Sequence, residues 1–222
     1  TTGKRNKLGA WARRLAPMWM LASATLCAAP AGANLVGTVT AVDPAWTLKA
    51  IARPVPASTP FVEVRGSKLL KAPLRLSGQY LRPDADTLVR EVRAPYAETT
   101  TLRAGEATIA RAGQAPRKFA LSRVPELAGF QSNFAALLDG DRARLEQHYT
   151  LAAQGTRQRW NLTMAPRDAA LAKRVQSIAL YGRGSELRCI ETRMVGSAPP
   201  QRTLLAGAAM DAANVADAAA LE

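Results

Sequence analysis

Short runs in which apolar and polar residues alternate recur through much of this chain after Phe61, and they limit its fold more than any other feature. In PLRLSGQYLRPD, which spans Pro73 to Asp84, the apolar side chains Leu74, Leu76 and Tyr80 all share one parity. A period of two residues is typical of a β-strand with one buried face. Similar runs recur as far as 206, and the turns between them carry Gly, Pro or Asp. Such short turns favour antiparallel neighbours.

The alternation predicts a mainly β chain of the α+β class, with about ten strands in one sheet. We expect the strands near 61–65, 69–81, 88–94, 98–104, 107–111, 117–122, 148–154, 157–164, 176–182, 186–195 and 202–206. A sheet of that many strands curls, and its concave face must then be filled by side chains, by a helix or by a ligand.

Two helices are predicted within this sheet-forming chain. A short one lies near PAWTLKAIA, where Trp46, Leu48 and Ile51 line one side. A longer one begins near Pro125 and ends at Gly140. Its apolar residues recur at steps of three and four and therefore share one face; they are Leu127, Phe130, Phe134, Leu137 and Leu138.

The two ends of the chain differ from its middle. Residues 1–33 resemble a secretory signal peptide, with a basic start, an apolar run from Leu15 to Ala29 and the Ala31-Gly32-Ala33 cleavage pattern. We expect the domain over 34–206, which suits the length of one domain. The Ala-rich tail, 207–222, has few large apolar residues, so we expect it to be poorly ordered.

The chain is strongly basic, with a formal net charge of +13. Cleavage after Ala33 removes five basic residues and no acidic ones, which leaves +8. This excess favours contact with an anionic membrane surface. We do not expect nucleic acid as a partner, because export removes the chain from the cytoplasm and no basic stripe is interleaved with aromatics.

The sequence offers little catalytic chemistry, so we predict that the protein is not an enzyme. The lone histidine, His148, falls in a predicted strand, and turns or helix ends explain Asp139 and Asp141. No Cys and His cluster has the spacing of a metal site, and we expect no cofactor. After cleavage Cys189 is the one cysteine left, and we interpret it as a small buried residue.

The order of these pieces is similar to one known family. A signal peptide and a short helix precede FVEVR and LLKAPLRLSGQYLRPDADTLVREVRAPYAETTTLRAGEATIAR, and PELAGFQSNFAALLDGDRARLEQHY follows. This resembles the LolA family of periplasmic lipoprotein carriers, especially its divergent LolA-like branch, over roughly 45–205. The resemblance implies an incomplete antiparallel β-barrel with a helical lid, which receives acyl chains in its apolar interior.

The resemblance also assigns expected roles to residues of this chain. The helix with Leu127, Phe130, Phe134, Leu137 and Leu138 becomes the lid, and Arg82 of the Arg82-Pro83 turn becomes the residue that closes it. The expected cavity lining is Phe61, Leu74, Leu76, Tyr80, Leu88, Val92, Leu102, Ile109, Trp160, Leu162, Ile178 and Leu180. The expected partners are the acyl chains of a lipoprotein or lipid, an inner-membrane donor transporter and an outer-membrane acceptor.

The expected function is therefore that of a monomeric periplasmic carrier that moves a lipoprotein or lipid towards the outer membrane. Three alternatives stay open. One is a lipid-binding subunit of an envelope export assembly that does not shuttle. A second is a hydrolase that uses Asp139, Asp141 or His148, and a third is a polyanion-binding β domain, whose binding would fall steeply with salt.

Overall fold

The structure is a computed structural model, and it describes residues 41–65, 73–121, 135–196 and 199–215. The chain divides into a unit of Thr1–Gly37, which lies outside the described residues, and a compact unit of Thr38–Glu222. The strands of the second unit are β1 Ala57–Arg65, β2 Leu74–Arg82, β3 Leu88–Ala94, β4 Glu98–Arg103, β5 Glu106–Arg111, β6 Arg117–Ala120, β7 Tyr149–Gly155, β8 Trp160–Pro166, β9 Val175–Arg183, β10 Glu186–Met194 and β11 Gln201–Leu205.

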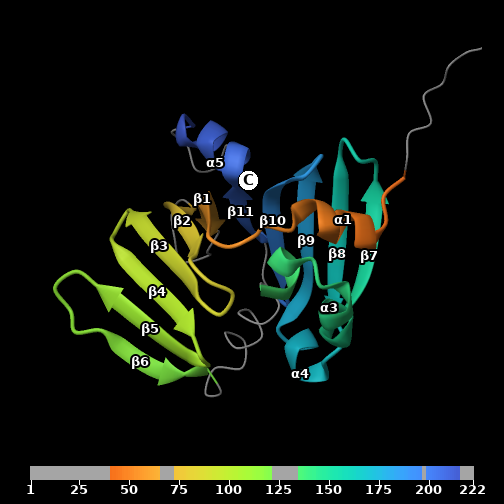
Figure 1. Ribbon diagram of the computed structural model, residues 1–222. Helices are drawn as coiled ribbons and strands as arrows, with labels where there is room; N and C mark the ends of the chain where they lie inside the picture. Colours follow the sequence, from red (N-terminus) through yellow and green to blue (C-terminus); the bar gives the residue numbers. More distant parts are fainter. Residues whose placement is uncertain (1–40, 66–72, 122–134, 197–198, 216–222) are drawn as a thin grey trace, which may run out of the picture. The chain divides into compact units, whose positions relative to one another are not determined.

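All eleven strands belong to one antiparallel sheet in the order β6-β5-β4-β3-β2-β1-β11-β10-β9-β8-β7. Because β1 pairs with β11, the end of the domain lies beside its beginning, and the two halves of the sheet join there (Figure 1). Strands β6 and β7 are the two edges of the sheet, which is not closed. The predicted class, an incomplete antiparallel barrel of about ten strands, is confirmed.

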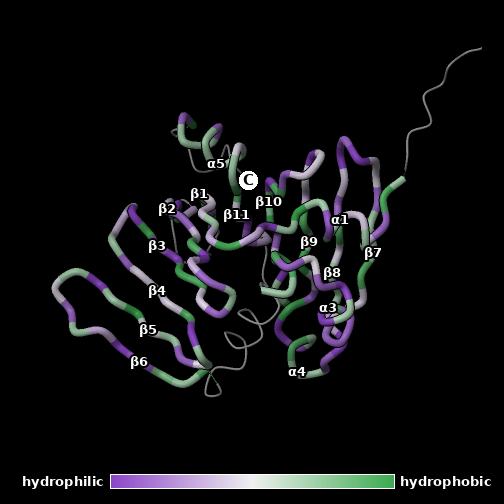
Figure 2. The backbone as a smooth tube through the Cα atoms, viewed as in Figure 1, coloured by the Kyte–Doolittle hydropathy of each residue, from purple (hydrophilic) through white to green (hydrophobic). Residues whose placement is uncertain are grey.

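The described strands lie within a few residues of their predicted positions because the alternation is local. Residues 69–72 and 122 of the predicted strands lie outside the described residues. Along the strands in Figure 2 the colour changes between hydrophobic and hydrophilic at short intervals, as expected for a sheet with one apolar face. Gly78 fits this sheet only without a side chain, because a Cβ there would lie 1.8 Å from the backbone oxygen of Glu91. The pairing of β2 with β3 shifts register between Ser77 and Gly78.

Helix α1, Pro44–Ile51, packs on the half of the sheet formed by β7, β8 and β10 (Figure 1). Asp43 caps it by accepting a hydrogen bond from the backbone nitrogen of Trp46 at 2.8 Å, and Pro44 follows at the first helical position. Its Leu48 and Ile51 are buried, as the predicted helix face requires. Helix α1 therefore covers part of the apolar face of the sheet.

Helix α3, Arg142–His148, lies where the sequence analysis had placed no helix. Asp141 caps it by accepting from the backbone nitrogen of Arg144 at 3.0 Å, and its Leu145 is fully buried. His148 is the last residue of α3, so its predicted place inside a strand is wrong. The short helix α4, Ala169–Ala172, follows β8, where the sequence predicted a helix or a turn.

Helix α5, Ala206–Ala213, occupies a stretch for which the sequence predicted poor order. It packs through Ala209 and Ala212 against Val62 and Leu204. Arg75 donates from Nη2 to the carbonyl of Ala212 at 2.8 Å and thereby caps the helix end. Small side chains suffice here because they let the helix approach the sheet closely. A search for large apolar residues at helical spacing does not detect such a helix.

Candidate functional site

The candidate site is the apolar face of the sheet, which the strand registers define. Residues directly opposite each other in a pair of strands project to the same face. Phe61 is opposite Leu205, Leu88 is opposite Leu102, and Leu162 is opposite Leu180. Followed strand by strand, these pairings put all twelve residues of the expected cavity lining on one face, opposite to the face that α5 covers.

The twelve side chains divide into two packed groups. Leu88, Leu102, Trp160, Leu162 and Leu180 are buried in a core that also includes Leu48 and Ile51 of α1. Phe61, Leu76 and Val92 are buried in a second group, against which Leu74 and Tyr80 pack. Ile178 packs at the border of the first group, and Ile109 is half-buried. Much of the described apolar face is thus filled by side chains of the protein itself.

A pocket of about 70 Å³ lies where the two groups meet. Tyr80 and Leu88 of the expected lining, Leu138 of the expected lid and Arg82 of the expected closure all line it. Its remaining walls come from the segment after α1, from β1 and from the start of β10 and the end of β11. Ligand sites for small molecules usually measure about 300–1,000 Å³, so the volume of this pocket is well below the usual range.

Arg82 reaches the helical residues 135–139, which end the expected lid. Its Nη2 donates to Asp139 Oδ1 at 2.5 Å, and its Nη1 donates to the carbonyl of Arg53 at 3.4 Å. Leu137 is buried and Leu138 is half-buried in the core beside α1. The other expected lid residues, Leu127, Phe130 and Phe134, lie outside the described residues. A buried guanidinium thus ties β2 to the segment that covers the pocket.

An ionic cluster that the sequence analysis missed lies on the same face. The Glu63 side chain is 2% exposed, and it accepts from Arg65, from Arg90 Nη2 at 2.8 Å and from Gln201 Nε2 at 2.9 Å. Arg90 also lies 4.9 Å from the centre of the Phe61 ring, in a cation–π geometry. Polar and ionic contacts of Glu63 thus connect β1 with β3 and β11 near the middle of the sheet.

Tyr80 connects this cluster with the pocket. Its ring centre lies 4.8 Å from that of Phe61, and its side chain lines the pocket. Burial raises the pKa of the Tyr80 phenol. Glu63 and Arg90 could have been suspected from the sequence, since each stands two residues from an inward apolar residue, Phe61 or Val92, on its own strand.

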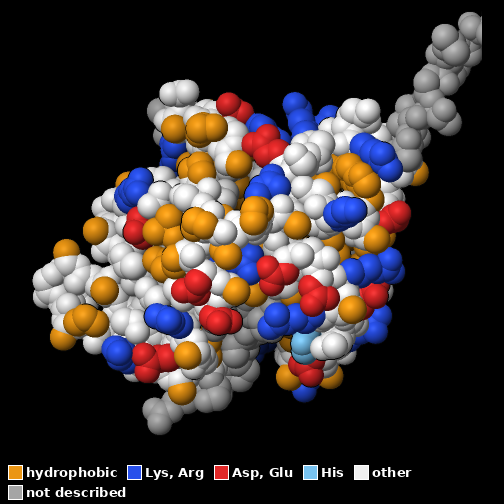
Figure 3. Space-filling view, in the orientation of Figure 1, with side chains coloured by type: hydrophobic (Ala, Val, Ile, Leu, Met, Phe, Trp, Pro, Cys, Tyr) orange, Lys and Arg blue, Asp and Glu red, His pale blue; other side chains and the backbone are white. Residues whose placement is uncertain are grey.

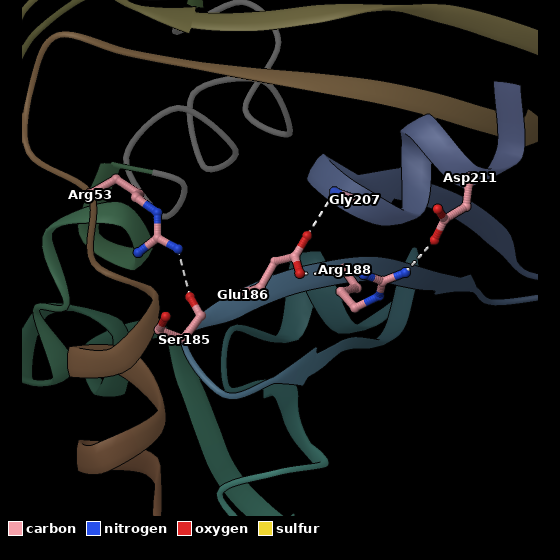
Figure 4. Close-up of polar contacts among 6 residues, drawn as sticks. All are labelled: Arg53, Ser185, Glu186, Arg188, Gly207 and Asp211. Carbon is pink, nitrogen blue, oxygen red and sulfur yellow. Dashed lines mark hydrogen bonds and ion pairs between the residues drawn. The ribbon is translucent and has the colours of Figure 1, made fainter.

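The rim of the pocket is polar and fixes α5 to β10 (Figure 4). Arg53 donates from Nη2 to the carbonyl of Ser185 at 2.6 Å. Glu186, which lines the pocket, accepts from the backbone nitrogen of Gly207 at 2.7 Å and so caps α5, whose N-cap residue supplies no side-chain bond. Arg188 donates to Asp211 at 2.8 Å, and this hydrogen bond raises the pKa of Arg188.

The residues of the alternative hydrolase have structural roles. Asp139 accepts from Arg82, Asp141 caps α3, and His148 ends that helix. Among the described residues no group of three His, Cys, Asp or Glu side chains could hold a metal ion. Cys189 is half-buried on the face that α5 covers, and burial raises its pKa to about 11.

No helix in the part of the chain that the structure describes has the length and apolarity needed to span a membrane. A comparison with curated protein sequences finds no match. A LolA superfamily protein from Nitrosomonas europaea is similar at 12% identity and a TM-score of 0.37, with 74% of this chain and 91% of that chain covered. LprF from Mycobacterium bovis is similar at 13% identity and a TM-score of 0.34, with the same shares of 74% and 91%.

The comparison with family models gives the assignment. The model described as "Outer membrane lipoprotein carrier protein LolA-like" matches residues 36–222, which include every described strand and helix. That match covers both the face that carries the pocket and the helix α5 behind it. The chain therefore belongs to the LolA-like family of outer membrane lipoprotein carrier proteins.

Proposed function

We propose that the protein is a periplasmic carrier that binds the acyl chains of a lipoprotein or lipid on the apolar face of its sheet and transfers them towards the outer membrane. The observation that carries the proposal is the meeting of Tyr80, Leu88, Leu138 and Arg82 around one pocket. These residues come from the expected lining, lid and closure. The proposed donor is an inner-membrane transporter and the proposed acceptor an outer-membrane protein.

The pocket of about 70 Å³ is too small for a whole acyl chain, so cargo must displace protein side chains from the apolar face. Burial of fifteen methylenes gains on the order of 12 kcal/mol before ordering costs, which is ample for extraction from water. The helical residues 135–139 are suited to being displaced, because Leu137 and Leu138 fill space that cargo would take. Their return offsets part of the gain, so release remains feasible.

A titration with a fluorescent fatty-acid probe tests acyl binding. Leu76→Glu puts a carboxylate at a fully buried position on the apolar face, and Leu138→Glu puts one at the half-buried pocket wall. Both should abolish probe binding, while Tyr181→Glu, on the opposite face and 38% exposed, should retain it. Thermal unfolding shows which variants fold, and unchanged binding by a folded Leu138→Glu variant would reject the site.

Native mass spectrometry of the protein isolated from the periplasm tests the carrier role. A soluble monomer with bound lipoprotein or lipid supports a shuttle and identifies the cargo. Cargo found only in a membrane-bound assembly would favour a lipid-binding subunit that does not shuttle.

A further inference from the structure

The end of the sheet at α4 carries exposed apolar side chains. Met194 and Val195, at the end of β10 and just after it, are 39% and 53% exposed. Val195 donates its backbone N–H to the carbonyl of Arg174 at 2.8 Å, which holds it beside the turn that follows α4. Helix α4 has the sequence AALA, and its three alanines are exposed. These exposed apolar residues thus lie at the same end of the sheet.

Basic residues surround these apolar residues. Arg167, Lys173, Arg174 and Arg193 are all exposed. With α4, Met194 and Val195 they make up what we name the α4 tip. In Figure 3 hydrophobic, basic and a few acidic side chains gather at the lower end of the molecule, where Figure 1 places α4.

Two acidic groups at the α4 tip are engaged locally. Asp168 caps α4 by accepting from the backbone nitrogen of Leu171 at 2.8 Å. The Glu191 side chain is 5% exposed and pairs with Arg193 at 2.8 Å and with Arg202 at 3.0 Å. Among the described residues of the tip, four cationic side chains stand against the two carboxylates of Asp168 and Glu191, so the net charge of the tip is positive.

We propose that the α4 tip is a docking surface for an anionic phospholipid bilayer. Apolar side chains that protrude within a set of Lys and Arg residues enter the boundary between headgroups and acyl chains, while the cations pair with lipid phosphates. Charge complementarity favours this occupant over an apolar protein partner, because an apolar surface would desolvate the cations without supplying an opposite charge. The excess positive charge of the whole chain acts in the same direction at longer range.

The α4 tip and the pocket lie at opposite ends of β10. Glu186 begins the strand and lines the pocket, whereas Met194 ends it. Docking through the tip therefore leaves the Arg82–Asp139 contact away from the bilayer. Changes at the tip should also leave acyl binding unchanged, so that this inference can fail without the proposed function failing.

Vesicle flotation tests the proposal. The chain starting at Asn34, which contains the whole compact unit, is mixed with vesicles of phosphatidylcholine alone or with equal phosphatidylglycerol. It should bind the anionic vesicles, and an Arg167→Glu/Lys173→Glu variant should bind about tenfold more weakly or worse. Val195→Asp should weaken binding as well, because it removes the inserted apolar group.

Matched controls lie elsewhere on the surface. Met210→Asp changes a methionine that is 62% exposed on α5, and Arg103→Glu reverses an exposed charge at the end of β4. Both should retain vesicle binding, and all variants should retain the fatty-acid probe and the unfolding temperature. Absence of wild-type binding to anionic vesicles, or equal losses in controls and tip variants, would overturn the proposal. So would tip variants that bind vesicles normally while losing an acidic protein partner.

Discussion

Arg82 and Asp139 bond at 2.5 Å across 57 residues of sequence, and their exposures differ greatly. The Arg82 side chain is 5% exposed, whereas that of Asp139 is 45% exposed. Among the described residues, removal of the carboxylate would leave the buried guanidinium with the carbonyl of Arg53, at 3.4 Å, as its acceptor. The buried Arg82 of β2 therefore holds the segment 135–139 through its exposed residue Asp139.

Asp139→Ala should speed the release of bound cargo. Without its carboxylate the covering segment is held more weakly, so we expect the dissociation rate of a fatty-acid probe to rise several-fold. Stopped-flow displacement measures that rate.

Glu146→Ala is the control for Asp139→Ala, because it removes an exposed ion pair with Arg142 within α3, and it should leave the dissociation rate unchanged. Arg82→Leu should act in the same direction as Asp139→Ala, and normal loading and unloading in both variants would remove Arg82 from the mechanism.

Glu63→Ala should strongly destabilise the fold. It removes the carboxylate that Arg65, Arg90 and Gln201 share and leaves the Arg90 side chain, which is 18% exposed, without its anion. Breaking one partner of a buried ion pair costs about 3–5 kcal/mol. Urea unfolding measures this loss.

Glu91→Ala is the control for Glu63→Ala, because Glu91 pairs on the other face of the sheet, where its side chain is 32% exposed. It should cost about 1 kcal/mol or less. Equal losses of unfolding free energy in the two variants would show that the Glu63 cluster stabilises the fold no more than an exposed ion pair does.

The strands could be predicted from the sequence because their signal is local. In PLRLSGQYLR the alternation of Leu74, Leu76 and Tyr80 alone indicates a strand with one apolar face, and β2 follows it. The same parity placed the twelve expected lining residues on one face. Their role in binding cargo stays a prediction, as does the lid role of Leu127, Phe130 and Phe134.

Features that depend on distant contacts were not predictable in the same way. The Glu63 cluster requires the registers of β1 with β11, of β1 with β2 and of β2 with β3, which no local pattern encodes. Helix α5 packs through Ala209 and Ala212, accepts a hydrogen bond from Arg75 and donates one to Glu186, so its stability comes from elements far along the chain. Helix α3 has a single buried leucine, Leu145, which is too few for a periodic signal.

Gly78→Ala should be among the most destabilising small substitutions in the sheet. The added Cβ would lie 1.8 Å from the Glu91 carbonyl oxygen, a backbone atom that moves only with β3. We expect a loss of about 3 kcal/mol, at the upper end of overpacking costs. Thermal or urea unfolding measures it, with Ser77→Ala as the control at the adjacent position. A loss below about 1 kcal/mol would mean that β2 and β3 separate easily there.

Cys189 should react slowly with alkylating reagents in the folded protein. Burial raises its pKa to about 11, Glu191 adds to the rise and Arg202 opposes it. In an unfolded chain the thiol has a pKa near 8.5, so at pH 8 the folded protein should react about a hundredfold more slowly than the same protein in urea. The chain starting at Asn34 is used because it lacks Cys27. The rate of alkylation of the folded protein should keep rising with pH towards 11. The same titration should lower the free energy of unfolding above about pH 8.5, since the unfolded chain loses its proton first.

Iodoacetamide labelling followed by mass spectrometry across this pH range measures the rate of alkylation. A plateau of that rate near pH 9 would contradict the burial of the thiol.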